Sequence, residues 1–257
     1  MAMLRRHTES DVFPKPMCGG SLIDSRHVMT AAHCTIDKPF RDGHNFTVRL
    51  GEFNHGTDAE SNHTDYQVER VFNHPDFVAN GSYINDIALL RLSTEVQFSP
   101  VVCTVTLPHG PTGDLAGKNV TVAGWGYAAP ILAELDMTAI SVDECYKQFV
   151  DNDFFPLQEK EKKICAVTRE EMDGVCDGDS GGPLMEYGHF RVVGIVSAGY
   201  GECGDPQVIP ETFTRVSAFL DWINETATIP GTATRTQHCQ DTFIENPPSS
   251  KPYWSFD

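Results

Sequence analysis

The segment CDGDSGGPL, residues 176–184, is the most specific stretch of this 257-residue sequence. Its three glycines permit backbone angles that other residues avoid, so the chain can turn tightly around a single serine, Ser180. In such a turn the backbone N–H groups of Gly178 and Ser180 point to one spot, where they would stabilise a negatively charged oxygen. The segment therefore predicts a reactive serine with an oxyanion hole rather than a chance glycine-rich loop.

A serine hydroxyl is a poor nucleophile until an imidazole removes its proton, and the imidazole needs an acid behind it. The sequence supplies both partners upstream, in TAAHC around His33 and NDIALLRL around Asp86. His33 would act first as general base and then as general acid, Asp86 would orient it, and Ser180 would attack. We therefore predict a catalytic triad made of these three residues.

The three segments, in the order His, Asp, Ser, resemble the chymotrypsin-like family of serine peptidases. The resemblance covers about residues 17–226 and includes CGGSLI before the histidine, VAGWG at 122–126 and a closing FLDWI helix. It implies a secreted serine endopeptidase that hydrolyses peptide bonds through an acyl-enzyme on Ser180. It implies no obligatory cofactor and no metal ligand.

Short runs rich in Val, Ile, Phe and Thr, separated by Gly, Pro, Asn and Asp, predict an antiparallel all-β protein. The runs are FTVRL, YQVERVF, IALLRL, NVTVAGW, FRVVGIVSAG and TFTRVS. Together with the resemblance they imply two antiparallel Greek-key β-barrels and a C-terminal helix at 217–226, capped by Ser217. We expect the first barrel to lack its first strand, because no matching apolar run precedes CGGSLI.

Three segments are expected along the chain: an irregular N-terminal segment at 1–16, a peptidase domain at 17–228 and a tail at 229–257. Barrel one should span about 17–108 and barrel two about 118–216. The tail is rich in Pro, Thr and Ser without a sustained hydrophobic period, so it should have no core of its own.

Eight cysteines, spread singly rather than in close metal-binding pairs, favour disulfides in an oxidising compartment. The resemblance implies the pairs Cys18–Cys34, Cys145–Cys165 and Cys176–Cys203. Two interpretations remain open for Cys103: a disulfide to Cys239 that holds the tail, or a bond to a segment that this chain lacks.

Five N-x-S/T sequons favour a secreted glycoprotein, although no secretory signal opens the chain. They lie at Asn45, Asn62, Asn80, Asn119 and Asn224. The formal net charge of −17 disfavours nucleic acid and anionic membranes as partners, and no apolar run reaches the ~18 residues of a membrane span. We expect a monomer whose partners are a protein or peptide substrate and a macromolecular inhibitor.

The primary substrate pocket differs from the usual family pattern. Gly174, six residues before Ser180, takes the place of the residue that usually sets specificity, whereas Glu211 stands on the pocket wall where the family usually has glycine. A carboxylate there would favour a Lys or Arg side chain; in the alternative, Glu211 obstructs the pocket and small or apolar residues are preferred. The other substrate-binding positions that the family implies are Val175, Asp177, Ser197, Ala198 and Gly199. Ala198 stands where the family usually has Trp.

Activation in this family pairs a newly freed amino terminus with the aspartate before the serine, which is Asp179 here. The sequence before CGGSLI contains no Ile-Val-Gly-Gly to supply that terminus. A second hypothesis is therefore a zymogen-like or noncatalytic serine protease homologue that acts as a binding or regulatory protein. A third is hydrolysis of small esters only.

Glu52 and Glu60 resemble the calcium loop of some family members. Their spacing does not match that loop, so we expect a solvated acidic loop without a metal.

Overall fold

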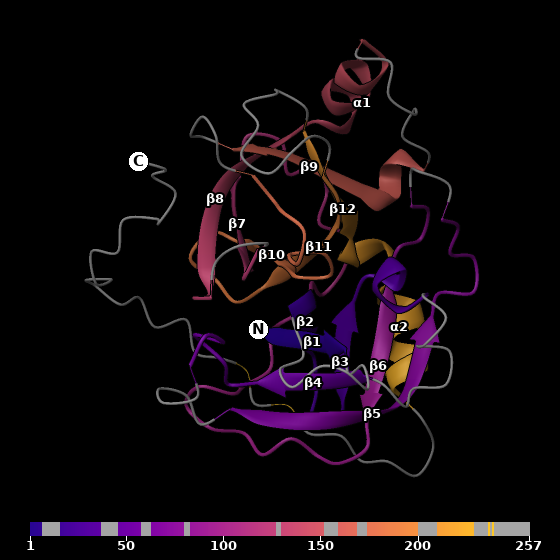
Figure 1. The fold of residues 1–257 in the computed structure, drawn as a ribbon. Helices are drawn as coiled ribbons and strands as arrows, with labels where there is room; N and C mark the ends of the chain where they lie inside the picture. Colours follow the sequence, from indigo (N-terminus) through magenta and orange to yellow (C-terminus); the bar gives the residue numbers. More distant parts are fainter. Residues whose placement is uncertain are drawn as a thin grey trace, which may run out of the picture.

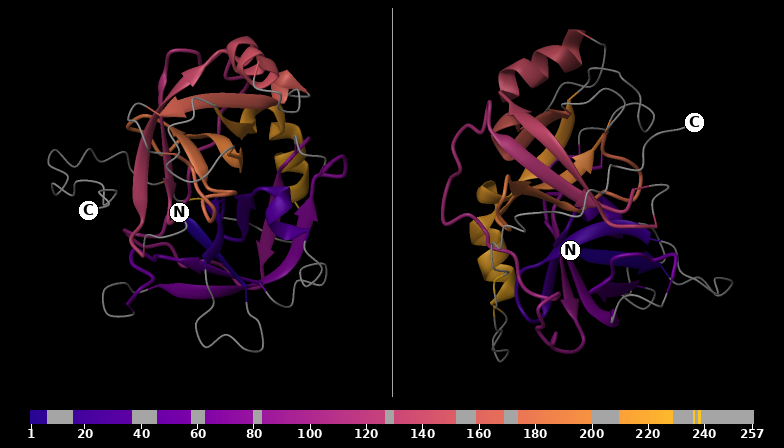
Figure 2. Two further views of the ribbon diagram at one scale, coloured as in Figure 1. Left: turned by 45° about the horizontal axis from the view of Figure 1, so that its top comes forward. Right: turned by 90° about the vertical axis from the view of Figure 1, so that its left-hand side faces the viewer.

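The computed structural model describes residues 1–6, 16–36, 46–57, 63–79, 83–126, 130–151, 159–168, 174–199, 210–228, 236 and 238. In this part of the chain, twelve strands form two closed antiparallel barrels of six strands each, packed against one another (Figures 1 and 2). This arrangement confirms the predicted fold class of two antiparallel β-barrels.

Barrel one contains the first six strands, in the neighbour order β1-β2-β3-β6-β5-β4. Their bounds are β1 Ala2–Arg6, β2 Pro16–Leu22, β3 His27–Thr30, β4 Phe46–Leu50, β5 Thr64–Asn73 and β6 Ala88–Leu92. Strand β1 closes the barrel because it pairs with both β2 and β4. Leu4, Val28, Val48 and Leu90 are among the buried side chains of its core.

The presence of β1 differs from the expectation that barrel one lacks its first strand and that residues 1–16 are irregular. Ala2, Met3 and Leu4 are fully buried, so three apolar side chains are enough for this short strand. Arg5 ends the apolar run in the sequence but is also buried in the strand. Its guanidinium forms an ion pair with Asp65 Oδ2 at 3.1 Å. The arginine therefore belongs to a barrel strand and not to an irregular segment.

Barrel two contains the other six strands, in the neighbour order β10-β11-β12-β9-β8-β7. Their bounds are β7 Asn119–Gly124, β8 Ala133–Ile140, β9 Lys163–Thr168, β10 Pro183–Glu186, β11 Val192–Ala198 and β12 Glu211–Arg215. Pairing of β10 with β7 closes it. Met137, Ile164, Leu184 and Phe213 fill its interior.

Helix α1, Val142–Asp151, was not predicted from the sequence. It follows β8, and the Ser141 hydroxyl accepts the backbone N–H of Glu144 at 3.2 Å, which caps the first turn. Cys145 and Phe149 are fully buried, and the disulfide Cys145–Cys165 joins the helix to β9.

Helix α2, Leu220–Ala227, follows the last strand as predicted, but Ser217 does not cap it. The Ser217 hydroxyl lies 3.1 Å from the Thr112 hydroxyl instead, and a 3-10 turn at Val216–Ala218 precedes the helix. The apolar face of α2 covers barrel one, where Ile223 joins the core (Figure 1). The chain thus returns from barrel two to barrel one and ties the two together.

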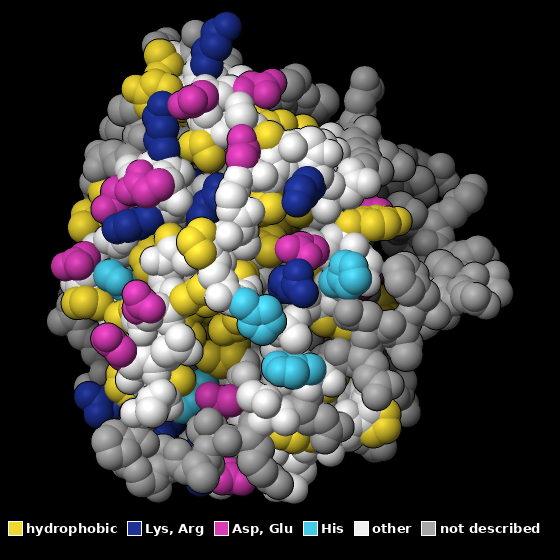
Figure 3. Space-filling view, turned by 180° about the vertical axis from the view of Figure 1, so that it is seen from behind, with side chains coloured by type: hydrophobic (Ala, Val, Ile, Leu, Met, Phe, Trp, Pro, Cys, Tyr) yellow, Lys and Arg dark blue, Asp and Glu magenta, His cyan; other side chains and the backbone are white. Residues whose placement is uncertain are grey.

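Charged side chains of both signs lie on the face of the molecule that Figure 3 shows. On the face shown in Figure 3, the described Lys and Arg side chains are scattered among Asp and Glu and form no continuous basic patch. Neither described helix is long and apolar enough to cross a membrane.

Candidate active site

The three predicted triad segments meet where the two barrels touch. His33 lies on a 3-10 turn, Ala32–Thr35, just after β3 of barrel one, and Asp86 lies just before β6. Ser180 lies in the turn before β10 of barrel two, and its carbonyl oxygen accepts the N–H of Gly19 in β2 at 2.7 Å. The junction therefore brings residues far apart in sequence to one place.

Asp86 is fully buried, and its carboxylate holds His33 through two contacts. Oδ1 accepts the backbone N–H of His33 at 2.9 Å, and Oδ2 lies 2.8 Å from His33 Nδ1. Barrel two fixes the same residue, because Ser197 Oγ donates to Oδ2 at 2.7 Å and Thr214 Oγ1 donates to the Asp86 carbonyl at 2.9 Å. This arrangement selects the imidazole tautomer that leaves Nε2 free to accept a proton.

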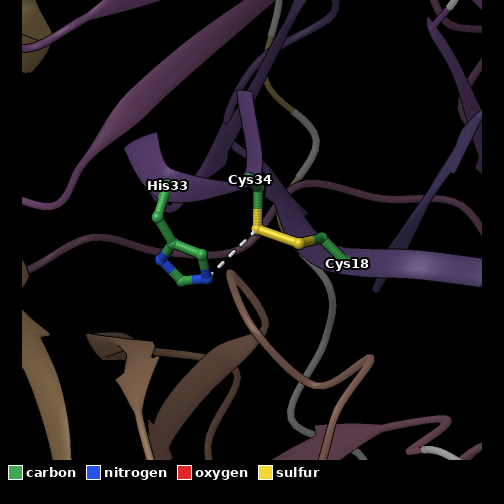
Figure 4. Close-up of side chains that lie close together, drawn as sticks. All are labelled: Cys18, His33 and Cys34. Carbon is green, nitrogen blue, oxygen red and sulfur yellow. Dashed lines mark hydrogen bonds between the residues drawn. A yellow bond between two sulfur atoms is a disulfide. The ribbon is translucent and has the colours of Figure 1, made fainter. Parts of the chain in front are cut away.

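The other ring nitrogen, His33 Nε2, lies 3.8 Å from Cys34 Sγ, as Figure 4 shows. Among the described residues no hydrogen bond joins Nε2 to the Ser180 hydroxyl; in substrate-free enzymes such bonds are often long and tighten when substrate binds. Cys18, His33 and Cys34 offer closely spaced ligand atoms, but the two sulfurs form a disulfide, so no thiolate is present to bind a metal.

The turn around Ser180 needs its glycines. Gly178 has a φ of 100° and Gly181 a φ of 78°, a backbone region that side chains disfavour. A Cβ on Gly181 would also collide with the Thr30 hydroxyl. The Asp179 N–H closes the turn onto the Cys176 carbonyl at 3.0 Å. The glycine pattern that predicted a tight turn therefore has a direct steric cause.

Asp179 is buried, and its two oxygens accept backbone N–H groups from Gly126 at 2.9 Å and Cys176 at 3.0 Å. Burial raises the pKa of this carboxyl, and the two N–H contacts oppose that effect. Among the described residues Asp179 forms no ion pair. In the described part of the chain, its carboxylate oxygens are therefore held by neutral backbone donors.

The predicted pocket residues Gly174, Val175, Gly199 and Glu211 lie together. A Cβ added to Gly174 would lie 3.4 Å from Glu211 Oε1, and one added to Gly199 would lie 2.7 Å from Oε2. The Val175 N–H donates to the Glu211 carboxyl, whereas Oε2 is buried with no hydrogen-bond partner in the described part of the chain. Burial raises the pKa of Glu211 to about 8.

The structure also describes three further predicted pocket positions, Asp177, Ser197 and Ala198. The Asp177 side chain is exposed. Ala198 ends β11, where its carbonyl accepts the Thr212 hydroxyl at 3.1 Å. The Ser197 hydroxyl donates to Asp86 Oδ2 at 2.7 Å, and the role of Ser197 in substrate binding stays a prediction.

The disulfides Cys18–Cys34 and Cys145–Cys165 are both formed, as the family resemblance implied. Cys103 and Cys176 are also disulfide-bonded. The partners expected for them, Cys239 and Cys203, lie outside the described residues. His238, beside Cys239 in the sequence, forms a parallel bridge with Thr104.

Two candidate glycosylation sites, Asn119 and Asn224, are exposed. The other three, Asn45, Asn62 and Asn80, lie outside the described residues, as does Glu60.

Glu52 is not part of a solvated acidic loop. It is buried, and its Oε2 lies 3.0 Å from Arg49 Nη1 and 3.3 Å from His63 Nδ1. The Arg49 guanidinium compensates its buried charge, so the expectation for this residue was wrong.

Sequence reasoning missed two residues beside the triad. The Tyr83 ring lies over His33 with ring centroids 5.0 Å apart, and Lys163 is buried near Ser197. A lysine that opens the apolar strand KICAV was the available signal for Lys163. No local sequence pattern indicates that Lys163 contacts Tyr83, which lies 80 positions earlier in the chain.

A family model described as Trypsin matches residues 1–223. The proclotting enzyme of Tachypleus tridentatus is 36% identical over 223 residues, which are 81% of this chain and 58% of that protein. Melanization protease 1 of Drosophila melanogaster is 36% identical over 233 residues, or 80% of this chain and 57% of that protein. The chain thus spans less than two thirds of the length of these relatives.

Proposed function

Because the chain belongs to the trypsin family of serine peptidases, we propose that it is a secreted serine endopeptidase with His33, Asp86 and Ser180 as its catalytic triad. The observation that carries the proposal is the pairing of buried Asp86 with His33 at 2.8 Å, at the junction where the Ser180 turn also lies. A buried carboxylate bound to Nδ1 is what a histidine needs to act as a general base through Nε2.

In the proposed reaction, His33 Nε2 takes the proton of the Ser180 hydroxyl while Ser180 Oγ attacks the carbonyl carbon of the scissile peptide bond. Asp86 stabilises the imidazolium that forms. The N–H groups of Gly178 and Ser180 are proposed to receive the negative charge on the carbonyl oxygen. His33 then returns its proton to the leaving amine, and water repeats the sequence to release the acyl group from Ser180.

We propose that the primary pocket prefers a Lys or Arg side chain through Glu211. Its Oε2 is buried without a hydrogen-bond partner among the described residues, and burial raises its pKa to about 8. A substrate cation would supply the missing partner and favour the ionised carboxylate. The opposite arrangement, in which Glu211 obstructs the pocket, predicts a preference for small or apolar residues.

The test uses two matched peptide substrates that differ only in having Arg or Leu before the scissile bond. Faster cleavage after Arg, lost in Glu211→Gln, supports the pocket assignment; faster cleavage after Leu in both proteins contradicts it. Cleavage of neither peptide, with hydrolysis of a matched ester, would support the esterase alternative. The His33→Ala variant should abolish every one of these activities.

Clotting and melanization appear in the names of the similar proteins and suggest a limited proteolytic cascade as the setting. We propose secretion, glycosylation at the exposed Asn119 and Asn224, and the additional disulfides Cys176–Cys203 and Cys103–Cys239. The bridge between Thr104 and His238 supports the last pair, because each residue is the sequence neighbour of one of the cysteines. Peptide mapping without reduction tests both pairs. A noncatalytic role is not favoured by the family match or by these relatives.

A further inference from the structure

The loop that carries Asp86 has an unfavourable backbone. Tyr83 has a φ of 41° and Asn85 a φ of 51°, in the left-handed region that residues other than glycine seldom adopt. Such conformations persist only where the surroundings hold them, and they concentrate at functional sites. The contacts that hold this loop therefore help to determine where the catalytic carboxylate lies.

Two consecutive lysines of barrel two supply such contacts from across the junction. Lys162 Nζ donates to Asn85 Oδ1 at 2.8 Å, and Lys163 Nζ donates to the Tyr83 carbonyl at 2.7 Å. Lys162 ends a 3-10 turn and Lys163 begins β9, and their contacts hold the loop at two different points.

The environments of the two lysines differ. Lys162 is only partly buried and forms an ion pair with Glu159 at 2.8 Å. Lys163 is 2% exposed, and its Nζ lies 3.5 Å from the Ser197 hydroxyl that donates to Asp86. From these distances the ammonium of Lys163 is within about 6 Å of the Asp86 carboxylate. At that range in a protein interior, one charge acts strongly on another.

Removal from water lowers the pKa of Lys163 to about 8, although Asp86 and Glu159 act in the opposite direction. Other charged or titratable groups around this cluster are His33, held by Asp86, Lys162 on the adjoining turn, and Arg215 of β12, whose guanidinium donates to the Lys163 carbonyl at 3.0 Å. Lys163 can therefore lose its proton near pH 8.

We propose that Lys163 is a positioning residue of the triad, whose buried ammonium holds the Tyr83–Asp86 loop and Ser197 in place and couples its own charge to the contact between His33 and Asp86. This inference rests on the proposed function for the role of that contact. The described contacts of its ammonium are with the Tyr83 carbonyl and the Ser197 hydroxyl, so it acts through Asp86. Loss of its proton removes a cation beside the carboxylate and weakens the bond to the Tyr83 carbonyl.

The test follows the proton on His33 Nδ1 by NMR while the whole chain is titrated from about pH 6 to 10. The resonance of this proton reports the contact with Asp86 directly and needs no turnover. In the native chain it should shift with a midpoint near pH 8, where Lys163 titrates. In Lys163→Met, which keeps the side-chain length without charge or donor, the transition should vanish.

Lys162→Met is the matched control, because it removes the neighbouring lysine that contacts the same loop through Asn85. This variant should keep the transition. Lys163→Gln keeps a hydrogen-bond donor without the charge and should lose the transition as well. A midpoint near pH 8 that persists in Lys163→Met, or a native chain without one, would overturn the proposal. Because Glu211 also has a pKa of about 8, the comparison of the native chain with Lys163→Met and Lys163→Gln decides the outcome.

Kinetics give a second readout that separates positioning from binding. With the peptide substrate, Lys163→Met should lower kcat about tenfold, the effect of losing one good hydrogen bond at the triad, while KM stays unchanged. If the NMR transition is present but the chain cleaves no substrate, the proposed function fails. The coupling between Lys163 and the His33–Asp86 contact would then still hold.

Discussion

Replacing Glu211 with Gln should stabilise the free protein at neutral and alkaline pH. Burial raises the pKa of Glu211 to about 8 from an ordinary value of 4.5. A carboxyl with a raised pKa in the folded state stabilises the protein fully below its unfolded pKa, and this contribution is lost as pH rises through the folded pKa. Gln has nearly the same shape and no charge, so its contribution does not change with pH.

The size of the effect follows from the same two pKa values. Between pH 4.5 and pH 7 the linkage amounts to about 3 kcal/mol, at 1.36 kcal/mol for each pH unit. The native protein should lose this much free energy of unfolding relative to Glu211→Gln over that range. The difference should grow further up to pH 8 and then level off.

Urea unfolding of both proteins at several pH values measures the difference directly, because all other titrating groups are shared. Glu225→Gln, which makes the same substitution at an exposed glutamate on α2, is the matched control. Parallel stability curves for the native protein and Glu211→Gln would refute the assignment of a buried carboxyl with a raised pKa.

Three other predictions concern the primary pocket, the catalytic triad and the disulfide Cys145–Cys165. Benzamidinium, a small cation that probes the same pocket, should bind more tightly as pH rises toward 8 and lose this dependence in Glu211→Gln, as calorimetry would show. Asp86→Asn should lower kcat about 10⁴-fold in a peptidase assay, because the amide favours the wrong imidazole tautomer; an effect below about tenfold would count against the triad. Replacing both Cys145 and Cys165 with Ser should lower the free energy of unfolding by about 3 kcal/mol in urea, and an unchanged midpoint would contradict this.

The sequence predicted the site better than the contacts that support it. His33, Asp86 and Ser180 lie in local motifs whose spacing and glycines have direct steric or chemical causes, and the structure brings their segments to one junction. Lys163 could not be found in this way, because its partner Tyr83 is 80 positions away and the bond depends on how the barrels pack.

The errors in secondary structure also have physical reasons. Strand β1 was missed because Arg5 interrupts a short apolar run, and its long-range partner Asp65 could not be read from local sequence. Helix α1 carries a readable signal, since Ser141 and Glu144 form the S-x-x-E pattern of a helix start, but its ten residues offer only a short apolar stripe. Ser217 appeared to be a cap, yet its hydroxyl contacts Thr112 of the segment that joins the barrels.

The most direct test of the central claim is labelling of the folded chain with a fluorophosphonate, which reacts with a serine only when a neighbouring base and an oxyanion hole activate it. The proposal predicts that one label attaches to Ser180 and that Ser180→Ala and His33→Ala each abolish it. A folded chain that takes up no label, or one whose labelling survives either substitution, would contradict the assignment of His33, Asp86 and Ser180 as a working triad.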